Sequence, residues 1–371
     1  MSNLRLFGNI YRDKKILVTG NTGFKGSWLC TWLIFMGAKV YGIAKDIPTN
    51  PSVFEELRLS ERIVHFTEDI RHYERLRNII NDIAPDFIFH LAAQAIVSRS
   101  YQDPLNTISS NVIGTTNLLE ALRNYEKPCV AVIITSDKCY DNVEWVWGYK
   151  ETDVLGGKDI YSGSKGAAEL IFKSYFYSFF KEKKPLIKIA TARAGNVIGG
   201  GDWALDRIVP DCMRSWNMGK TVEIRNPKAT RPWQHVLEPL SGYLLLGQCL
   251  CNNEKLNGES FNFGPSSEYS HTVQDILEYM SIRWHFDDSD KAYHVTGDIP
   301  FHEAGLLKLN CDKALFHLHW LPTLDYEKLL NYTSDWYYEY YKNKSDMLDY
   351  SLSQIQEYIQ LAVQKGRTWT K

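Results

Sequence analysis

The chain has 371 residues, which is enough for one large domain with a smaller lobe or for two domains. Hydrophobic residues make up 44% of the chain and charged residues 23%, a composition that excludes a disordered, collagen-like or coiled-coil protein. The 42 Lys and Arg are balanced by 44 Asp and Glu, so the chain lacks the overall basic excess of a dedicated nucleic-acid-binding protein.

The seven cysteines are dispersed, and the one close pair, Cys249 and Cys251, lacks the spacing and the partners of a zinc site. We therefore expect reduced thiols and no bound metal. The N-terminus carries no signal-peptide pattern, and the longest apolar run, at residues 27–38, is too short to cross a bilayer. These features predict a cytoplasmic protein that does not enter a membrane.

Short apolar or β-branched runs alternate with helical patterns over the first two hundred residues. A helix with Leu29, Leu33 and Met36 on one face follows the first run, and Gly37 ends it. The later helices lie before Pro85, around Leu118–Leu122 and over residues 161–181. The predicted strands are 15–19, 39–44, 63–66, 87–91, 131–135 and 187–192. Six strands alternating with helices predict an α/β fold, a doubly wound parallel sheet covered on both faces.

The alternation weakens after Gly199, where Gly, Pro, Trp and Arg become frequent. We predict a first domain over residues 1–200 and a smaller C-terminal α/β lobe over residues 201–371. A segment near residues 231–250 is expected to return and pack on the first domain. The tail from Ser351 has an apolar helical face and is expected to pack on its own lobe.

Three glycines mark the turn between the first strand and the first helix. Gly20, Gly23 and Gly26 leave room for backbone amides and the helix N-terminus to approach a pyrophosphate. Thr22, Phe24 and Lys25 belong to the same turn and are expected to contact the ligand. The spacing and its place after the first strand predict a Rossmann-type dinucleotide site.

The end of the second strand leaves the choice of dinucleotide open. The acidic residue that usually binds the adenosine ribose is replaced by Ala44, and Lys45 and Asp46 follow it. Lys45 would favour the additional phosphate of NADP, whereas Asp46 could bind the two ribose hydroxyls of NAD. Residues after the third and fourth strands are expected to contact the adenine and line the cofactor cleft; they are Asp69, Ile70, Leu91, Ala92, Ala93 and Gln94.

Tyr161 and Lys165 lie one helical turn apart, so the ammonium can lower the pKa of the phenol and make it a usable acid or base. Tyr followed four residues later by Lys occurs six times in the chain, and position must distinguish them. Only Tyr161 opens a helix soon after the fifth strand, whose end carries Ser136, Asp137 and Lys138. Ligands of open α/β sheets bind beyond such strand ends, so these five residues predict a catalytic cluster.

Taken together, the glycine turn, Ser136 and the Tyr161–Lys165 pair resemble the extended short-chain dehydrogenase/reductase family. The resemblance extends to its nucleotide-sugar 4,6-dehydratases through TSDKCYDN at 135–142, VWGYKE at 146–151, RAGNVIGGGDW at 193–203 and RPWQHV at 231–236. It covers roughly residues 14–315. It implies NAD as cofactor, CDP-glucose or a related nucleotide sugar as substrate, a sugar-nucleotide-binding C-terminal lobe and a homodimer packed through helices near residues 105–125 and 161–181.

The resemblance also implies a mechanism. Tyr161 would take the proton of the sugar C4 hydroxyl while NAD accepts the hydride, and Ser136 would hydrogen-bond the same oxygen. The resulting ketone acidifies C5–H, so that water can leave across C5 and C6 before the hydride returns to C6. Asp137 would protonate the departing hydroxyl. Lys138 stands where related enzymes carry Glu, and it can act as the C5 base only if burial or a neighbouring cation lowers its pKa.

Substrate contacts are expected from the segments that follow the sixth strand. Asn196 could bind a sugar or phosphate oxygen, and Arg207 and Arg231 could hold the diphosphate by charge-assisted hydrogen bonds. Trp203 could line the substrate cleft, although core packing accounts for such a residue equally well.

Three other functions stay open at this stage. A nucleotide-sugar 4-epimerase needs Ser136, Tyr161 and Lys165 but no elimination acid, so Asp137 argues against it. A 4,6-dehydratase of another nucleotide sugar is also compatible with the residues. A nonenzymatic nicotinamide sensor would have kept the fold without the chemistry. In the dehydratase interpretation, the product would supply deoxysugars of a bacterial surface polysaccharide such as the lipopolysaccharide O-antigen.

Overall fold

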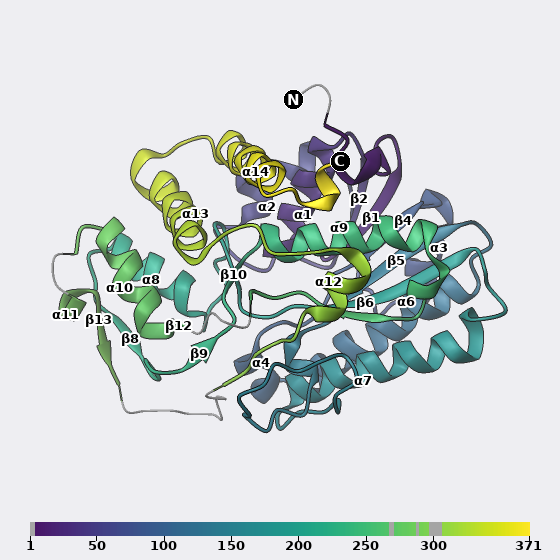
Figure 1. Ribbon diagram of the computed structural model, residues 1–371, viewed down its shortest axis with the longest axis horizontal. Helices are drawn as coiled ribbons and strands as arrows, with labels where there is room; N and C mark the ends of the chain where they lie inside the picture. Colours follow the sequence, from purple (N-terminus) through teal and green to yellow (C-terminus); the bar gives the residue numbers. More distant parts are fainter. Residues whose placement is uncertain (1–3, 267–270, 287–288, 297–305) are drawn as a thin grey trace.

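A parallel sheet of seven strands forms the centre of the protein in the computed structural model, which describes residues 4–266, 271–286, 289–296 and 306–371 (Figure 1). Its strand order is β3-β2-β1-β4-β5-β6-β11, and every neighbouring pair is parallel. The strands are β1 (Lys15–Thr19), β2 (Lys39–Ala44), β3 (Val64–Thr67), β4 (Phe87–His90), β5 (Cys129–Ile134), β6 (Ile187–Arg193) and β11 (Ser260–Asn262).

Helices cover both faces of this sheet. On one face lie α1 (Phe24–Phe35) and α9 (Leu237–Asn252), and on the other lie α3 (Tyr73–Ile83), α6 (Gly114–Arg123) and α7 (Ile160–Tyr175). Successive side chains of a strand point to opposite faces, so Ile16 and Val18 of β1 join the first core while Leu17 joins the second. The predicted doubly wound α/β fold is therefore confirmed.

The sequence-based prediction missed strand β11. It has three residues and pairs with β6 beside Thr191–Arg193, far along the chain from the alternating segment. Helix α9 precedes it and packs on β5 and β6, where the return of residues 231–250 was expected. The division of the chain at residue 200 stays a prediction.

Outside the large sheet, the described residues form three two-stranded sheets. They pair β7 (Val197–Ile198) with β10 (Gln234–His235), β8 (Val222–Ile224) with β13 (Tyr293–Val295), and β9 (Thr230–Arg231) with β12 (His271–Thr272). Strands β8, β9, β12 and β13 lie together at the left of Figure 1, beyond the carboxyl ends of the large sheet. The remaining helices are α2 (Val53–Glu56), α4 (Val97–Gln102), α5 (Pro104–Ile108), α8 (Ile208–Asn217), α10 (Val273–Arg283), α11 (Ser289–Ala292), α12 (Asp312–Leu318), α13 (Tyr326–Tyr338) and α14 (Met347–Gln364).

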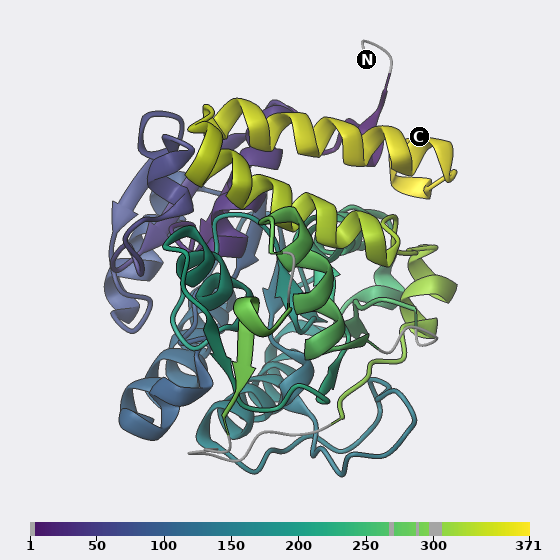
Figure 2. The ribbon, with the colours of Figure 1, turned by 90° about the vertical axis from the view of Figure 1, so that its left-hand side faces the viewer.

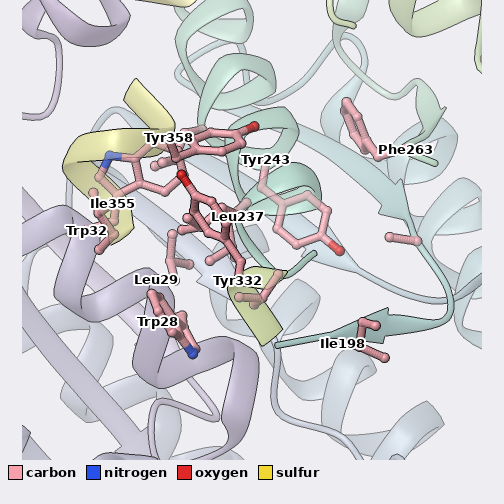
Figure 3. Packing of buried hydrophobic residues seen from close by; sticks show 14 of the residues in the cluster. Trp28, Leu29, Trp32, Ile198, Leu237, Tyr243, Phe263, Tyr332, Ile355 and Tyr358 are labelled. Atoms are coloured by element: carbon pink, nitrogen blue, oxygen red, sulfur yellow. The ribbon is translucent and has the colours of Figure 1, made fainter. Parts of the chain in front are cut away.

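The last two long helices, α13 and α14, lie side by side across one side of the molecule (Figure 2). Helix α14, in the C-terminal tail that was expected to pack on its own lobe, contacts α13 and also contacts α1 near the N-terminus. The Tyr358 ring of α14 lies edge-on to Trp32 of α1, with ring centroids 5.7 Å apart. Figure 3 shows the side chains of α1, α9, α13 and α14 meeting in this core.

The glycine-rich segment 199–201 is pressed between α1 and α13. The Trp28 indole donates a hydrogen bond to the Gly200 carbonyl at 2.9 Å. A Cβ atom on Gly200 would lie 1.9 Å from Cγ of Trp336, and one on Gly201 would lie 2.7 Å from Val53. These glycines are therefore required by close packing, and they fix the direction in which the chain continues to Asp202.

Among the described residues, no helix combines the length and the apolar composition that a bilayer span requires.

We predict that Gly200→Ala destabilises the protein, because the added methyl group overlaps the Trp336 ring and one of the two backbones must move. Overpacking of this kind lowers the free energy of unfolding by about 1–3 kcal/mol. Gly163→Ala is the matched control, since a Cβ atom there meets nothing within 4 Å and the residue lies inside α7. Denaturant unfolding of both variants measures the difference, and equal stability of the two would contradict the packing described for residues 199–201.

Candidate active site

The glycine turn between β1 and α1 is built without space for side chains. Gly20 has φ +72°, and a Cβ atom on it would lie 2.8 Å from the backbone nitrogen of Ala92. A Cβ atom on Gly26 would lie 2.1 Å from the Gly20 carbonyl oxygen. The first turn of α1 therefore packs directly on the turn, with Gly23 as its N-cap. This leaves a cradle of backbone amides at a helix N-terminus, which suits a pyrophosphate.

The end of β2 is tied to this turn. The Thr22 hydroxyl donates to the Asp46 carbonyl oxygen at 2.7 Å. The side chains of Lys45 and Asp46 are both half-exposed, and their charged atoms lie 3.6 Å apart. Both residues are thus at the place predicted for the adenosine ribose, and they neutralise each other there.

Asp69 and Ile70, the residues predicted to contact the adenine, interact with other side chains of the protein. Asp69 forms a two-pronged ion pair with Arg71, whose other nitrogen donates to Asn106 at 2.9 Å. Ile70 is buried and would meet a Cβ atom on Gly114 at 2.4 Å. Contact of Asp69 and Ile70 with an adenine stays a prediction.

After β4 the chain passes directly beside the glycine turn. The Ala92 amide donates to the Thr19 hydroxyl at 3.2 Å, and Leu91 and Ala93 flank it. Asn111 holds the chain at Gln94. Its Oδ1 accepts a hydrogen bond from the backbone N–H of Gln94 at 2.8 Å, and its Nδ2 donates to the Ser164 hydroxyl at 2.9 Å. Sequence reasoning missed Asn111, which links the cofactor side of the cleft to α7, because it lies in a helix without a recognisable motif.

The predicted catalytic residues Ser136 and Tyr161 come together at the carboxyl ends of the strands. Ser136 follows β5 and caps the short helix η4 (Asp137–Cys139), accepting from the Lys138 amide at 3.2 Å. Its hydroxyl donates to Asp137 at 3.0 Å. Tyr161 lies in the first turn of α7, which the Asp159 side chain caps. Both Ser136 and Tyr161 are buried.

Burial dominates the electrostatics of Tyr161. It raises the pKa of the phenol to about 12, and the Asp137 carboxylate acts in the same direction. A hydrogen bond with Ser136 and the positive charge of Arg207 act to lower the pKa, but they do not outweigh burial. The Lys165 Nζ lies 6.0 Å from the Tyr161 ring centroid, and the prediction that this ammonium makes Tyr161 a usable acid or base stays a prediction.

Two lysines share the site: Lys165 is buried and Lys25 is half-buried. Burial lowers the pKa of Lys165 to about 8, opposed by Cys139 and Glu169. Burial also lowers the pKa of Lys25 to about 8, helped by the positive charges of Lys165 and Arg207 and opposed by Asp137 and Asp202. Lys25 thus brings a cation from the glycine turn to the catalytic cluster, which its position in the sequence did not indicate.

Asp137 occupies a space that a missing side chain leaves open. A Cβ atom on Gly195 would lie 1.8 Å from its Oδ2, so only glycine at 195 permits this position. Asn196 donates to the same oxygen at 3.3 Å, with its backbone at φ +49°. The buried carboxylate is therefore held between Ser136 and Asn196, beside Tyr161.

Arg207 reaches the same cluster from the loop after the glycine segment. Its Nη1 lies 2.7 Å from the Asp202 carboxylate, which is nearly buried. Burial acts to lower the pKa of Arg207, but the ion pair with Asp202 raises it on balance. The loop is also tied to α4, because Ser98 donates to Asp206 at 2.5 Å. Sequence reasoning did not identify Asp202 as a site residue. Its only signal in the sequence is that it is the acidic residue of the string GGGDW.

The other predicted residues are Lys138, Arg231 and Trp203. Lys138 is half-buried in η4. Arg231, in β9, lines a cavity with Trp233, His271 and Tyr326. Trp203 is 3% exposed, packs against Trp336 and donates to the Tyr341 hydroxyl at 3.0 Å. Core packing accounts for Trp203, and its contact with a substrate stays a prediction. No group of three or more His, Cys, Asp or Glu in the described part of the chain is arranged to hold a metal ion.

Comparisons with known proteins show which family the chain resembles. The GDP-mannose 4,6 dehydratase family matches residues 17–333. A CDP-glucose 4,6-dehydratase of Salmonella typhimurium is 45% identical over 354 residues, which are 95% of this chain and 98% of that protein.

Solved structures share the fold. A UDP-glucose 4-epimerase of Thermotoga maritima, solved with UDP-glucose, superposes with a TM-score of 0.76 at 22% identity, covering 88% of this chain and 99% of that one. A dTDP-glucose 4,6-dehydratase of Bacillus anthracis, solved with NAD, gives a TM-score of 0.73 at 21% identity, covering 90% and 99%. With its family match, its 45% identical relative and this fold, the chain belongs to the GDP-mannose 4,6 dehydratase family, within the extended short-chain dehydrogenases/reductases.

Proposed function

We propose that the protein is an NAD-dependent hydro-lyase that converts CDP-D-glucose to CDP-4-dehydro-6-deoxy-D-glucose and water. The observation that carries the proposal is the placement of Asp137, a buried acid held between Ser136 and Asn196 beside Tyr161. The Salmonella typhimurium relative, at 45% identity over nearly its whole length, supports CDP-glucose as the substrate.

The cradle around Gly20, Gly23 and Gly26 fits the pyrophosphate of a dinucleotide, and the Thr22–Asp46 contact places the end of β2 beside it. NAD, when bound, supplies a reversible acceptor for the hydride of a sugar carbon. Asp46 is our choice for the ribose hydroxyls, with the Lys45 ammonium 3.6 Å from its carboxylate. If Lys45 instead of Asp46 faced the ribose, its positive charge would favour the additional phosphate of NADP.

In the first half of the reaction, Tyr161 takes the proton of the C4 hydroxyl while C4 loses its hydride. Ser136 donates a hydrogen bond to the same oxygen and holds it in place. Because burial raises the pKa of Tyr161, the phenolate needs nearby positive charge, which Lys165, Lys25 and Arg207 provide. The ketone formed at C4 then acidifies the hydrogen on C5.

In the second half, a base removes the C5 proton, and Asp137 donates a proton to the C6 hydroxyl, which leaves as water. The hydride stored from C4 returns to C6, and a proton returns to C5, so the reaction has no net redox change. We assign the C5 base to Lys138, which is adjacent to Asp137 and half-buried.

We assign the diphosphate to Arg207 and Arg231 and a sugar or phosphate oxygen to Asn196. The Asp202 ion pair orients Arg207 toward the cluster. Trp203 is proposed only as support for this loop, because its indole is enclosed by other aromatic rings. A 4-epimerase would use Ser136, Tyr161 and Lys165 in the same way but would have no use for an acid at residue 137.

The test is to incubate the purified protein with CDP-glucose and NAD and to follow the alkali-induced absorbance of a 4-keto-6-deoxy sugar. Mass spectrometry of the sugar nucleotide should show the loss of one water. An unchanged mass with a galacto-configured product would establish the epimerase instead. Binding of NAD without turnover of CDP-, UDP-, GDP- or dTDP-glucose would favour a nonenzymatic sensor.

Asp137→Asn should uncouple oxidation from water loss, because the amide preserves the shape of the side chain but cannot donate a proton as an acid does. We expect water loss to slow by about 10²- to 10⁴-fold, the range of general acid catalysis. Oxidation at C4 should proceed, so a 4-keto hexose two hydrogens lighter than the substrate should accumulate in a single turnover. Quenched-flow mass spectrometry measures both species, and parallel loss of the two steps would contradict the assignment.

We also propose that the protein is a homodimer. Helix α5, the segment Ser109–Ile113 and α7 pack side by side, and they carry exposed apolar side chains. These are Leu105, at 78% exposure, with Ile108, Ile113 and Leu170. Exposed Tyr177 lies in the segment Phe176–Phe180 that continues α7. Contiguous apolar side chains on neighbouring helices are typical of a four-helix interface between two copies.

Leu105→Asp should turn the dimer into a monomer, since a buried, unpaired carboxylate would face the partner copy. Phe316→Asp is the control, because Phe316 is 76% exposed but lies on α12, away from this surface. Sedimentation velocity gives the mass of each variant. A monomeric wild type, or a Leu105→Asp variant that stays dimeric, would rule out this interface.

For location and pathway, we propose the cytoplasm and the biosynthesis of deoxysugars for a bacterial surface polysaccharide such as the lipopolysaccharide O-antigen. All seven cysteines are free thiols, which supports a reducing compartment.

A further inference from the structure

A buried ion pair lies directly behind the catalytic residues. Glu169 is on α7, one helical turn after Lys165 and two turns after Tyr161, and only 1% of its side chain is exposed. Its Oε2 lies 2.8 Å from Nη2 of Arg193, whose side chain is 3% exposed. The mechanism above uses neither charge. Burying two charges costs free energy unless both are paired and hydrogen-bonded, so this pair calls for an explanation.

The Glu169 carboxylate is fully hydrogen-bonded by groups from three strands. Thr135, after β5, donates to Oε1 at 2.5 Å, and Thr191 of β6 donates to Oε2 at 2.9 Å. Ser260 of β11 donates to Oε2 at 3.1 Å. Arg193 continues the network by donating to the Tyr140 hydroxyl at 2.8 Å. One carboxylate thus joins α7 to the residue after β5 and to residues within β6 and β11.

These contacts set the distance between the two halves of the catalytic cluster. Thr135 directly precedes Ser136, so its bond to Glu169 ties the Ser136–Asp137 turn to the helix that carries Tyr161 and Lys165. No other described hydrogen bond joins the side chain of Thr135 to α7.

The same carboxylate is charged. Burial acts to raise the pKa of Glu169, but Arg193 and the hydroxyl donors lower it below its usual value. Around Lys165, the ionisable neighbours are Tyr161 and Glu169 on its own helix, Cys139 of η4, Lys25 of α1 and His90 of β4. Burial leaves His90 neutral, with its pKa lowered to about 3, and raises the pKa of the Cys139 thiol. Among these groups, Glu169 is therefore the one that carries a negative charge, and it lies one helical turn from Lys165 on α7.

We propose that Glu169 is a positioning residue for the reaction, which locks α7 to the Ser136 turn and supplies the negative charge that keeps the Lys165 ammonium protonated. The charge part rests on the one-turn spacing of Lys165 and Glu169 on α7 and on the buried Glu169–Arg193 ion pair, whereas its use in turnover rests on the proposed function.

Two variants that break the same ion pair distinguish charge from packing. Glu169→Gln removes the anion and leaves the Arg193 cation, so Lys165 should lose its proton at lower pH. Arg193→Gln leaves the anion uncompensated, so Lys165 should lose its proton at higher pH. A purely structural role predicts the same change in both variants, because both lose the same contact.

The first measurement needs no turnover. The full-length protein is labelled briefly with acetic anhydride over a range of pH, and acetylation of Lys165 is quantified by peptide mass spectrometry. Lys173, exposed on the same helix, is the internal control. We expect the Lys165 curve to move by about one pH unit, a tenfold change in its ionisation constant, downward in Glu169→Gln and upward in Arg193→Gln. Shifts in the same direction, or none, would overturn the proposal.

Thr191→Val is a control that separates the loss of a hydrogen bond to Glu169 from the loss of a charge. It removes one hydrogen bond from Glu169 but leaves both charges, so the Lys165 labelling curve should stay in place. If Glu169→Gln does not fold, judged by circular dichroism, the upward shift in Arg193→Gln against an unmoved Thr191→Val still decides the question. An Arg193→Gln curve at the wild-type position would then refute the charge effect.

Steady-state kinetics over a range of pH test whether the Glu169 charge affects the reaction. With CDP-glucose, the alkaline limb of the pH profile of kcat/KM should move to lower pH by about one unit in Glu169→Gln. The kcat should therefore fall about twofold at pH 7 and about tenfold well above pH 8, while KM changes little. If the wild type does not dehydrate any nucleotide sugar but the labelling curves separate, the proposed function fails and the charge effect stands. Unmoved kinetic profiles with separated labelling curves would refute the part in the reaction.

Discussion

The mutual dependence of buried and half-buried charges at the carboxyl edge of the sheet organises this protein. Lys25, Lys165 and Arg207 converge there with Asp137 and Asp202, and each alters the protonation of its neighbours. Charges taken out of water are costly unless they are paired, so none of these side chains can be considered alone. The phenol of Tyr161 sits among them, and its acidity depends on how many of the cations stay protonated.

Much of the remaining structure keeps these charges in place. Glycines bring backbones close enough for the charges to meet: Gly26 at the turn, Gly195 beside Asp137 and Gly200 beneath Trp336. The aromatic core of α1, α13 and α14 holds the segment from Gly199 to Trp203 rigidly, which orients the Asp202–Arg207 pair. Helices at the C-terminal end of the chain thereby support a site whose chemistry comes mainly from its first half.

The sequence predicted six of the seven central strands because each is a compact apolar run bounded by clear turns. It missed β11, whose three residues owe their strand geometry to pairing with β6 rather than to their own composition. It placed Ser136, Asp137, Tyr161 and Lys165 in one cluster because parallel strands end at one edge of a sheet. It did not find Asp202, Asn111 or Glu169, whose positions matter only through partners distant in the chain.

By itself, the sequence determined the fold class, the dinucleotide turn and the identity of the acid and base candidates, because these depend on local periodicity and on residue types at short spacing. Only the tertiary structure decided the balance of charges. Burial, rather than the adjacent lysine, sets the pKa of Tyr161, and it also brings Lys25 and Lys165 to a pKa of about 8. Desolvation depends on everything packed around a group, and no short stretch of sequence contains that information.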